Sequence, residues 1–389
     1  MSVQNPESAG ATLANWRAAP FSGWAFHLVR DLLPVADIAA GATPSVLVED
    51  PQTFDAFRLD FAGVSLDLPA FLEATATDGL IILRGDRIVF EAYRGGTTVE
   101  TPHILMSATK AVVGLMAGIL QREDLLDIDA PVSTYLPKMA TTAYAGARVR
   151  DLLDMRSGVT LDEIQEHAYA VASNWDPVAP GEAGVTLHGF LGGLATRDGT
   201  APGGPFRYIS ANTDLLGWVM EVATGRPFAD LVSDLLWKPL GAAHGAFITL
   251  DRAGSPRCTG GLCATVRDFA RIGAMVAAGG RVGNVQVVPA AWIHDLLSGG
   301  DREAWKTGEW GPAFRSISRE MSYRAGWYVT HDRPGTMFAM GIHGQNLFVD
   351  RENGVVIAKV SSQDQRTDHR ALALTHRAEP LLRTLALNA

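Results

Sequence analysis

The sequence predicts an α/β fold in which one mixed sheet is built from both ends of the chain, with a mainly helical domain inserted between them. β-Rich runs occur over 79–93 and again over 324–361, whereas helical patterns dominate the middle. A chain of 389 residues is also too long for one small core. We therefore expect an α/β domain made of 1–104 and 251–389, and a mainly helical domain over 105–250.

Two helices and a hairpin are predicted before the insert. Helices are expected at Trp24–Leu33, which ends before Pro34, and at Leu66–Ala76. The β-rich runs Gly79–Arg84 and Ile88–Tyr93 flank a Gly-Asp turn, which is typical of a β-hairpin. This hairpin would supply the N-terminal strands of the sheet.

The remaining elements follow from the same patterns. The stretch 160–204 has poor periodicity and is rich in Gly, Pro and Ala, so we expect loops and short helices that line a site. Helices are expected at Val149–Met155, Asn212–Thr224, Phe228–Leu240, Thr265–Ala278, Ala290–Leu297 and Arg370–Leu387. Strands are expected at Arg324–Thr330, Met337–Gly341, Gln345–Asp350 and Gly354–Ser361.

The stretch Met106–Leu120 is the candidate catalytic element. Ser107 and Lys110 form an S-x-x-K tetrad, and residues three apart lie on the same face of a helix. The run that follows is apolar around its whole circumference, as in a buried helix, and burial lowers the pKa of a lysine. A serine beside a lysine that can lose its proton is an activated nucleophile. S-x-x-K also occurs by chance with a solvated lysine, so the prediction needs further support.

Two other segments carry candidate site residues. Tyr208 precedes a predicted helix, where a tyrosine acts as a general acid or base or merely packs. His343-Gly344-Gln345 leads into a predicted strand, and its histidine is either structural or catalytic. The literal K-T-G at Lys306–Gly308 lacks a strand context, and the Ser-Asp pair at 233–234 is followed by leucine rather than asparagine, so neither is predicted to be functional.

Together these segments resemble the penicillin-recognising serine hydrolases, and within them the class C β-lactamase branch, which includes carboxylesterases and D-aminopeptidases. The subgroup that the chain resembles most is that of the 6-aminohexanoate-dimer (nylon-oligomer) hydrolases. Four stretches carry the likeness: WAFHLVRDLLP from Trp24, MSATKAVVG from Met106, YISANTD at Tyr208–Asp214, and GIHGQNL at Gly341–Leu347. The resemblance implies a β-lactamase-like fold and hydrolysis of small linear amides or esters through an acyl-enzyme.

The resemblance also implies residue roles. Ser107 would be the nucleophile, and Lys110 and Tyr208 would transfer its proton. The backbone N–H groups of Ser107 and Ile342 would form the oxyanion hole. Ser210 would bridge Lys110 by a hydrogen bond. His343, Gly344 and Gln345 would support the site, and the mechanism would need no metal or organic cofactor.

The substrate is left open between linear amides, carboxylic esters and, as an alternative, β-lactam or D,D-peptide substrates. Family members that cleave the nylon dimer hold its ammonium with acidic groups. The candidates here are Asp162, Glu163, Glu166, Asp176, Glu182, Asp364 and Asp368. Arg366 lies in the same loop as the last two, and a cation there would disfavour an ammonium.

Composition limits the partners. The net charge of −9 and the lack of a basic run argue against nucleic acid as a partner. The polar N-terminal stretch lacks the features of a signal peptide and no run of 18 apolar residues occurs, so we expect no membrane partner and a cytoplasmic location. Cys258 and Cys263 match no metal spacing and are expected to be buried free thiols, and a homodimer is left open.

Overall fold

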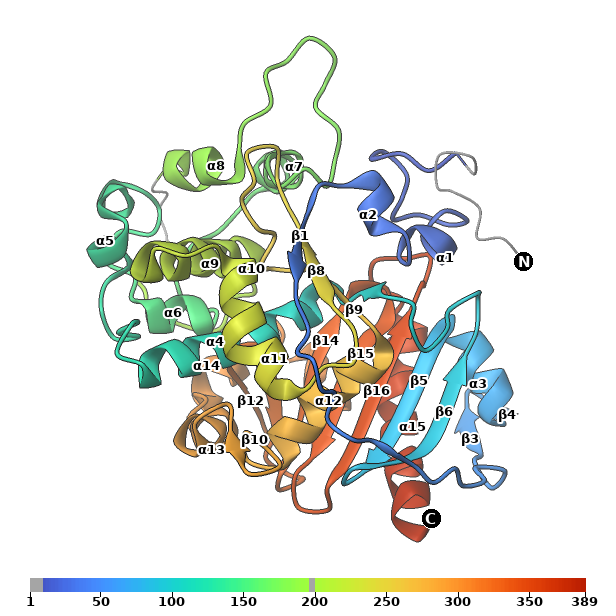
Figure 1. The fold of residues 1–389 in the computed structure, drawn as a ribbon. Coiled ribbons are helices and arrows are strands. Elements are labelled where there is room, and N and C mark those ends of the chain that lie inside the picture. Colours follow the sequence, from blue (N-terminus) through green and yellow to red (C-terminus); the bar gives the residue numbers. More distant parts are fainter. Residues whose placement is uncertain (1–9, 196–199) are drawn as a thin grey trace.

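The computed structural model describes residues 10–195 and 200–389, and its centre is an eight-stranded mixed sheet (Figure 1). Neighbouring strands are antiparallel except for β2 and β6, which are parallel. The strand order is β12 (Met321–Arg324), β13 (Trp327–Thr330), β14 (Thr336–Gly341), β15 (Gln345–Asp350), β16 (Val355–Ser361), β5 (Thr77–Arg84), β6 (Arg87–Tyr93) and β2 (Val48–Glu49). The predicted mixed sheet made from both chain ends is thereby confirmed.

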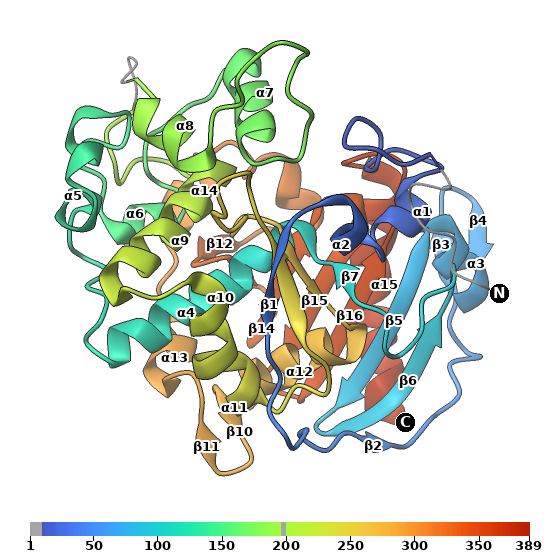
Figure 2. The same ribbon diagram turned by 45° about the horizontal axis from the view of Figure 1, so that its top comes forward.

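The central strands are buried on both faces, which is why they read as continuous apolar runs. Alternate residues of β16 face opposite layers: Val356 belongs to the core cluster of α12 (Val266–Ala277), and Ile357 to that of α15 (His369–Asn388). In Figures 1 and 2, α12 lies in front of the sheet and α15 behind it. Beside α15, the short helix α3 (Leu68–Ala74) covers the same face.

A second sheet, which the sequence did not predict, leads to the candidate nucleophile. Its strand order is β1 (Val35–Ile38), β8 (Ala246–Thr249), β9 (Leu262–Ala264) and β7 (His103–Ile104). All its pairs are antiparallel. The last of these strands ends immediately before the segment that carries Ser107, so this sheet fixes where that segment begins.

Helices dominate the middle of the chain, as expected, and the predicted 228–240 helix is continuous but contains a π-helical turn at Ser233–Trp237. In the stretch 160–204, the described residues 160–195 and 200–204 form two short helices, which lie at the top of Figure 1. The helices are α4 (Thr109–Arg122), α5 (Val132–Tyr135), α6 (Val149–Leu153), α7 (Glu163–Ala172), α8 (Leu187–Gly193), α9 (Ser210–Thr224), α10 (Phe228–Val232) and α11 (Lys238–Leu240). The division into the two predicted domains stays a prediction.

The other elements are short. Two hairpins lie outside the main sheets, β3 (Leu59–Phe61) with β4 (Val64–Leu66) and β10 (Arg281–Val282) with β11 (Val285–Gln286). Helices α13 (Ala290–Ser298) and α14 (Arg302–Lys306) follow. Across the described ranges, no helix is long and apolar enough to cross a membrane.

Two element predictions were wrong. The expected helix at Trp24–Leu33 is broken into α1 (Ser22–Ala25) and α2 (Val29–Leu32), because Leu28 leaves the helical region with φ −122° and ψ 28°. The expected strand at Arg324–Thr330 is correct only for Trp327–Thr330, because Arg324 ends the preceding strand of a hairpin. Ala325 and Gly326 both have positive φ, 46° and 90°, as the tight turn between β12 and β13 requires.

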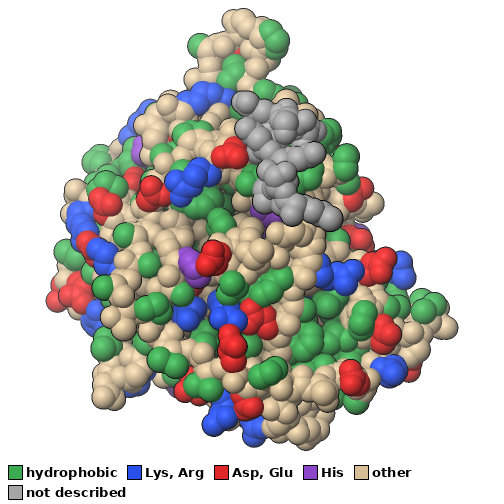
Figure 3. All heavy atoms as spheres, turned by 45° about the vertical axis from the view of Figure 1, so that its right-hand side comes forward, with side chains coloured by type: hydrophobic (Ala, Val, Ile, Leu, Met, Phe, Trp, Pro, Cys, Tyr) green, Lys and Arg blue, Asp and Glu red, His purple; other side chains and the backbone are tan. Residues whose placement is uncertain are grey.

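The predictions on the two cysteines and on the lack of a basic run can be compared directly with the structure. Cys258 and Cys263 are free and buried, as predicted. On the face shown in Figure 3, Lys and Arg side chains lie among acidic and apolar ones and form no broad basic area. That distribution agrees with the acidic net charge of −9.

Candidate active site

Ser107 lies in a 3₁₀ turn, Met106–Ala108, directly before α4. Met106 has a φ of 46°, a region that side-chain-bearing residues rarely adopt and that is often found next to catalytic groups. The whole segment from Thr109 to Leu120 is buried, so α4 is a rigid support. The Lys110 Nζ donates hydrogen bonds to Ser107 Oγ, at 3.0 Å, and to the Thr259 carbonyl oxygen, at 2.8 Å.

The electrostatic surroundings of Lys110 favour a neutral amine. Burial lowers the pKa of Lys110 well below its usual value, the negative charge of Asp214 opposes this shift, and the positive charge of Arg257 adds to it. A neutral amine 3.0 Å from a serine hydroxyl has a lone pair with which to accept its proton.

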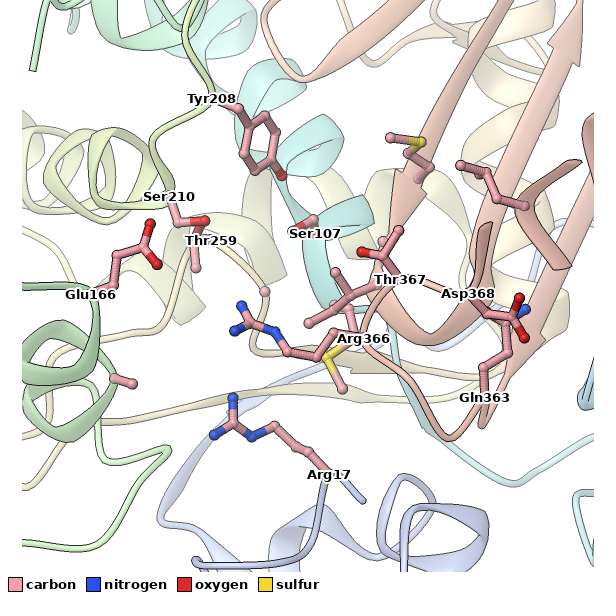
Figure 4. A pocket seen from close by; sticks show the side chains of 18 of the residues that line it. Arg17, Ser107, Glu166, Tyr208, Ser210, Thr259, Gln363, Arg366, Thr367 and Asp368 are labelled. Atoms are coloured by element: carbon pink, nitrogen blue, oxygen red, sulfur yellow. The ribbon is translucent and has the colours of Figure 1, made fainter. Parts of the chain in front are cut away.

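Tyr208 lies just before α9, and its hydroxyl points toward Ser107 (Figure 4). Its ring stacks on Trp310, with a centroid separation of 4.3 Å, and lies 4.8 Å from Lys110 Nζ. Burial raises the pKa of Tyr208, and a hydrogen bond with Ser107 acts in the opposite direction. The phenol therefore keeps its proton at neutral pH.

The Thr259 carbonyl that accepts from Lys110 is held by a buried network, which the sequence analysis did not predict. Asp214 accepts a hydrogen bond from the Thr259 backbone N–H, at 2.8 Å, and it pairs with both Arg257 and the Tyr169 hydroxyl. The Thr259 carbonyl is thus fixed in a direction where it accepts from Lys110. Asp214 closes the YISANTD segment, which was a usable signal, whereas the three partners come from distant elements.

Ser210 does not make the predicted contact. In the part of the chain that the structure describes, the hydrogen bonds of Lys110 go to Ser107 and Thr259, and none goes to Ser210. Ser210 is the first residue of α9 and lines the cleft beside Thr259 (Figure 4). The main-chain carbonyl of Thr259, whose residue is held by Asp214, accepts a hydrogen bond from Lys110 instead.

The end of β14 approaches the nucleophile closely. A Cβ atom at Gly341 would lie 2.7 Å from the Leu105 carbonyl oxygen and 2.9 Å from the Ser107 backbone nitrogen, so only glycine fits. Ile342 follows and lines the same cleft as Ser107. This packing places Gly341 against the backbone of Ser107, and Ile342 is the next residue along the chain; the oxyanion hole formed by their two backbone N–H groups, those of Ser107 and Ile342, stays a prediction.

In the His343-Gly344-Gln345 segment, one residue lines the cleft and the other two are buried. Gly344 lines the cleft, whereas His343 and Gln345 are buried behind it. His343 Nδ1 lies 2.7 Å from the Gln363 carbonyl oxygen, and burial lowers the pKa of His343 to about 4. Gln345 donates to the Ser361 carbonyl oxygen at 2.6 Å. These two side chains therefore fix the loop after β16 rather than contact a substrate.

The cleft has a volume of about 1160 Å³, enough for a small linear substrate. The N-terminal segment, α7, the segment 309–317 and the loop after β16 form its walls. Lys306 of the K-T-G sequence lies outside it, exposed and beside Glu303. The K-T-G sequence, which was predicted not to be functional, thus takes no part in this cleft.

One group of described residues could ligate a metal ion: His27, Asp78 and His103 offer atoms within 4.8 Å of one another. Asp78 and His103 already lie within hydrogen-bond distance, at 3.2 Å, and His27 lies 3.1 Å from the Thr97 hydroxyl. The group is outside the cleft that Ser107 lines. Its position supports the start of β7 and supplies no chemistry to the cleft.

Comparison with known proteins places this geometry in context. A family model described as beta-lactamase matches residues 69–381. The 6-aminohexanoate-dimer hydrolase of Paenarthrobacter ureafaciens is 36% identical over 370 residues, covering 92% of this chain and 90% of that enzyme. Esterase EstB of Burkholderia gladioli is 28% identical over 220 residues, covering 50% of this chain and 55% of the esterase. A Bacillus anthracis structure, proposed to be a 6-aminohexanoate-dimer hydrolase, has a TM-score of 0.88 at 22% identity and covers 98% of this chain and 99% of its own.

Proposed function

This chain belongs to the beta-lactamase family, and from that premise we propose that it hydrolyses small linear amides and carboxylic esters with Ser107 as the nucleophile. The membership confirms the resemblance and the β-lactamase-like fold that were inferred from the sequence motifs. The observation that carries the proposal is the pair of contacts on the Ser107 hydroxyl: Lys110 lies 3.0 Å away, and the Tyr208 hydroxyl points toward it.

In the proposed first half-reaction, Ser107 Oγ attacks the carbonyl carbon while the neutral amine of Lys110 accepts the hydroxyl proton. The new Oγ–C bond places a negative charge on the carbonyl oxygen. The backbone N–H groups of Ser107 and Ile342 would stabilise that charge. The Thr259 carbonyl accepts from Lys110 and would hold the resulting ammonium in place.

Tyr208 is proposed as the acid for the leaving group. The phenol is protonated at neutral pH and would donate its proton as the C–N or C–O bond breaks, and the Lys110 ammonium can then return a proton to the tyrosine. Water next attacks the acyl-enzyme with the same groups acting in reverse. That step releases the carboxylic acid and restores Ser107.

Active-site labelling tests this proposal directly. A fluorophosphonate probe should label the protein at Ser107, and Ser107→Ala should abolish both labelling and ester hydrolysis. Ser316 also lines the cleft, so Ser316→Ala is a matched control that should still be labelled. Labelling that maps to a serine other than Ser107 would contradict the assignment.

A second candidate function is a carboxylesterase with little amidase activity. The likeness to Esterase EstB favours it, because that relative is named as an esterase and is 28% identical over 220 residues. A side-by-side assay with p-nitrophenyl esters, the 6-aminohexanoate dimer and nitrocefin separates the readings. We expect cleavage of esters and of the linear amide and weak or no turnover of nitrocefin. Efficient nitrocefin hydrolysis would instead indicate a β-lactam-directed enzyme.

A further inference from the structure

The acidic side chains that might hold an ammonium substrate are mostly engaged with other groups. Four of the seven candidates accept hydrogen bonds or ion pairs from their own surroundings: Asp162, Asp176, Asp364 and Asp368. A fifth, Glu182, does not line the cleft. The two that remain, Glu163 and Glu166, are exposed side chains in the first turn of α7.

Two arginines face the other side of the cleft. Figure 4 shows the guanidinium groups of Arg17, from the N-terminal segment, and Arg366, from the loop after β16, beside each other and directed into the cleft. Arg17 pairs with Asp176 and donates to the Trp175 carbonyl oxygen. Within residues 10–195 and 200–389, no carboxylate pairs with the Arg366 guanidinium.

The main chain of Arg366 is fixed relative to the catalytic strand. Its carbonyl oxygen accepts from the His343 backbone N–H at 3.0 Å, and the Gln363 N–H donates to the His343 carbonyl oxygen at 3.2 Å. His343 directly follows Ile342, so the loop that carries Arg366 is anchored next to the proposed oxyanion hole. A substrate held there lies within reach of the guanidinium.

The guanidinium groups of Arg17 and Arg366 are close enough to repel each other. Burial lowers the pKa of Arg17, the Asp176 carboxylate opposes the shift, and the charges of Arg366 and Arg257 reinforce it. Burial is the main cause that lowers the pKa of the nearby His343, and the hydrogen bond to Gln363 opposes this shift. The charges of Arg17 and Arg366 lower the pKa of His343 further. An anion placed between the guanidinium groups would relieve this repulsion, and arginine suits a carboxylate because its fork donates two parallel hydrogen bonds.

We propose that the Arg366 side of the cleft binds a carboxylate of the substrate, with Arg366 as the main donor and Arg17 as a second positive charge. The preferred substrates are then small amides or esters that carry a free carboxylate group. This inference rests on the proposed hydrolase function, which it refines by naming a charge that the substrate must have.

Three p-nitrophenyl esters with the same six-carbon acyl chain test it: hexanoate, the monoester of adipate, and 6-aminohexanoate. They end in a methyl group, a carboxylate and an ammonium. A second pair, the hexanoyl esters of 3-hydroxybenzoate and 3-hydroxybenzamide, moves the carboxylate to the leaving half. In one of the two series, kcat/KM for the carboxylate substrate should exceed that of its neutral partner roughly tenfold or more, as expected for a charged hydrogen bond.

The decisive quantity is the ratio of kcat/KM for the carboxylate and neutral substrates. Arg366→Gln should bring this ratio close to one, Arg366→Lys should keep part of it, and added salt should reduce it in the wild type. Arg370→Gln is the matched control, because Arg370 is exposed in the same region but does not line the cleft, and it should leave the ratio unchanged.

The possible failures are distinguishable. Good turnover of the neutral esters without a carboxylate preference in either series would overturn this inference and leave the hydrolase proposal standing. A carboxylate preference that survives Arg366→Gln would overturn it as well, and so would a preference for the ammonium ester. Lack of turnover of every ester, together with no probe labelling at Ser107, would instead remove the proposed function itself.

Discussion

Replacing Gly341 by alanine tests whether the end of β14 aligns the proposed oxyanion hole. The added Cβ would lie 2.7 Å from the Leu105 carbonyl oxygen and 2.9 Å from the Ser107 nitrogen, closer than real Cβ contacts, so one of the two segments must shift. The φ of Gly341, −136°, is accessible to alanine, so the contact alone causes the effect. Loss of one oxyanion donor costs about 10²–10³ in kcat. For a partial displacement we expect a fall of about 10- to 1000-fold, or roughly 1.4–4 kcal/mol of barrier.

The assay is ester hydrolysis combined with thermal unfolding and inhibition by a boronic acid, which imitates the tetrahedral intermediate. The inhibition constant should rise together with the loss in kcat/KM, since both depend on the same N–H groups. Gly23→Ala is the control, because a Cβ there meets nothing within 4 Å, and it should leave kcat unchanged. A folded Gly341→Ala enzyme whose kcat stays within about threefold of the wild type would refute the reasoning.

Three further predictions address proton transfer and pH. Lys110→Arg keeps a long cationic side chain that cannot lose its proton and so cannot act as a base, and kcat should fall more than about tenfold; retention of a tenth of the activity would contradict this. Tyr208→Phe should reduce kcat/KM about 10²–10⁴-fold on an amide, which needs a protonated leaving group, and less on a p-nitrophenyl ester; equal losses would argue against its role as acid. Burial lowers the pKa of Lys359 from 10.5 to about 7, so the unfolded chain binds more protons above pH 7 and stability should rise with pH between these values. Denaturant unfolding of Lys359→Met should lack this rise.

The parts of the site that the sequence predicted depend on local patterns. The three-residue spacing of Ser107 and Lys110, followed by a run that is apolar on every side, is enough to specify a serine and a buried lysine one turn apart. The two β-rich runs of 79–93 and the Gly-Asp turn between them specify a hairpin in the same way. Such features require only the periodicity of the helix or strand that carries them.

The parts that were missed depend on contacts between distant segments. The small sheet pairs strands of two to four residues, among them β1 and β8, which lie about 200 positions apart, and strands this short have no periodicity to detect. The Asp214 network joins α9 to Arg257, Thr259 and α7. The Ser210 prediction failed for the same reason, because the group that accepts from Lys110 is a backbone carbonyl, which no side-chain motif reveals.

This distinction explains why the motifs identify the reaction better than the substrate. The proposed catalytic groups sit on elements with little freedom: α4 is buried throughout, and Gly341 permits no side chain. The cleft walls, in contrast, come from segments such as the loop after β16, where a side chain can change without disturbing those elements. Relatives named as a dimer hydrolase and as an esterase both resemble this chain, and the charge that Arg366 presents to the cleft is the feature from which its substrate should be inferred.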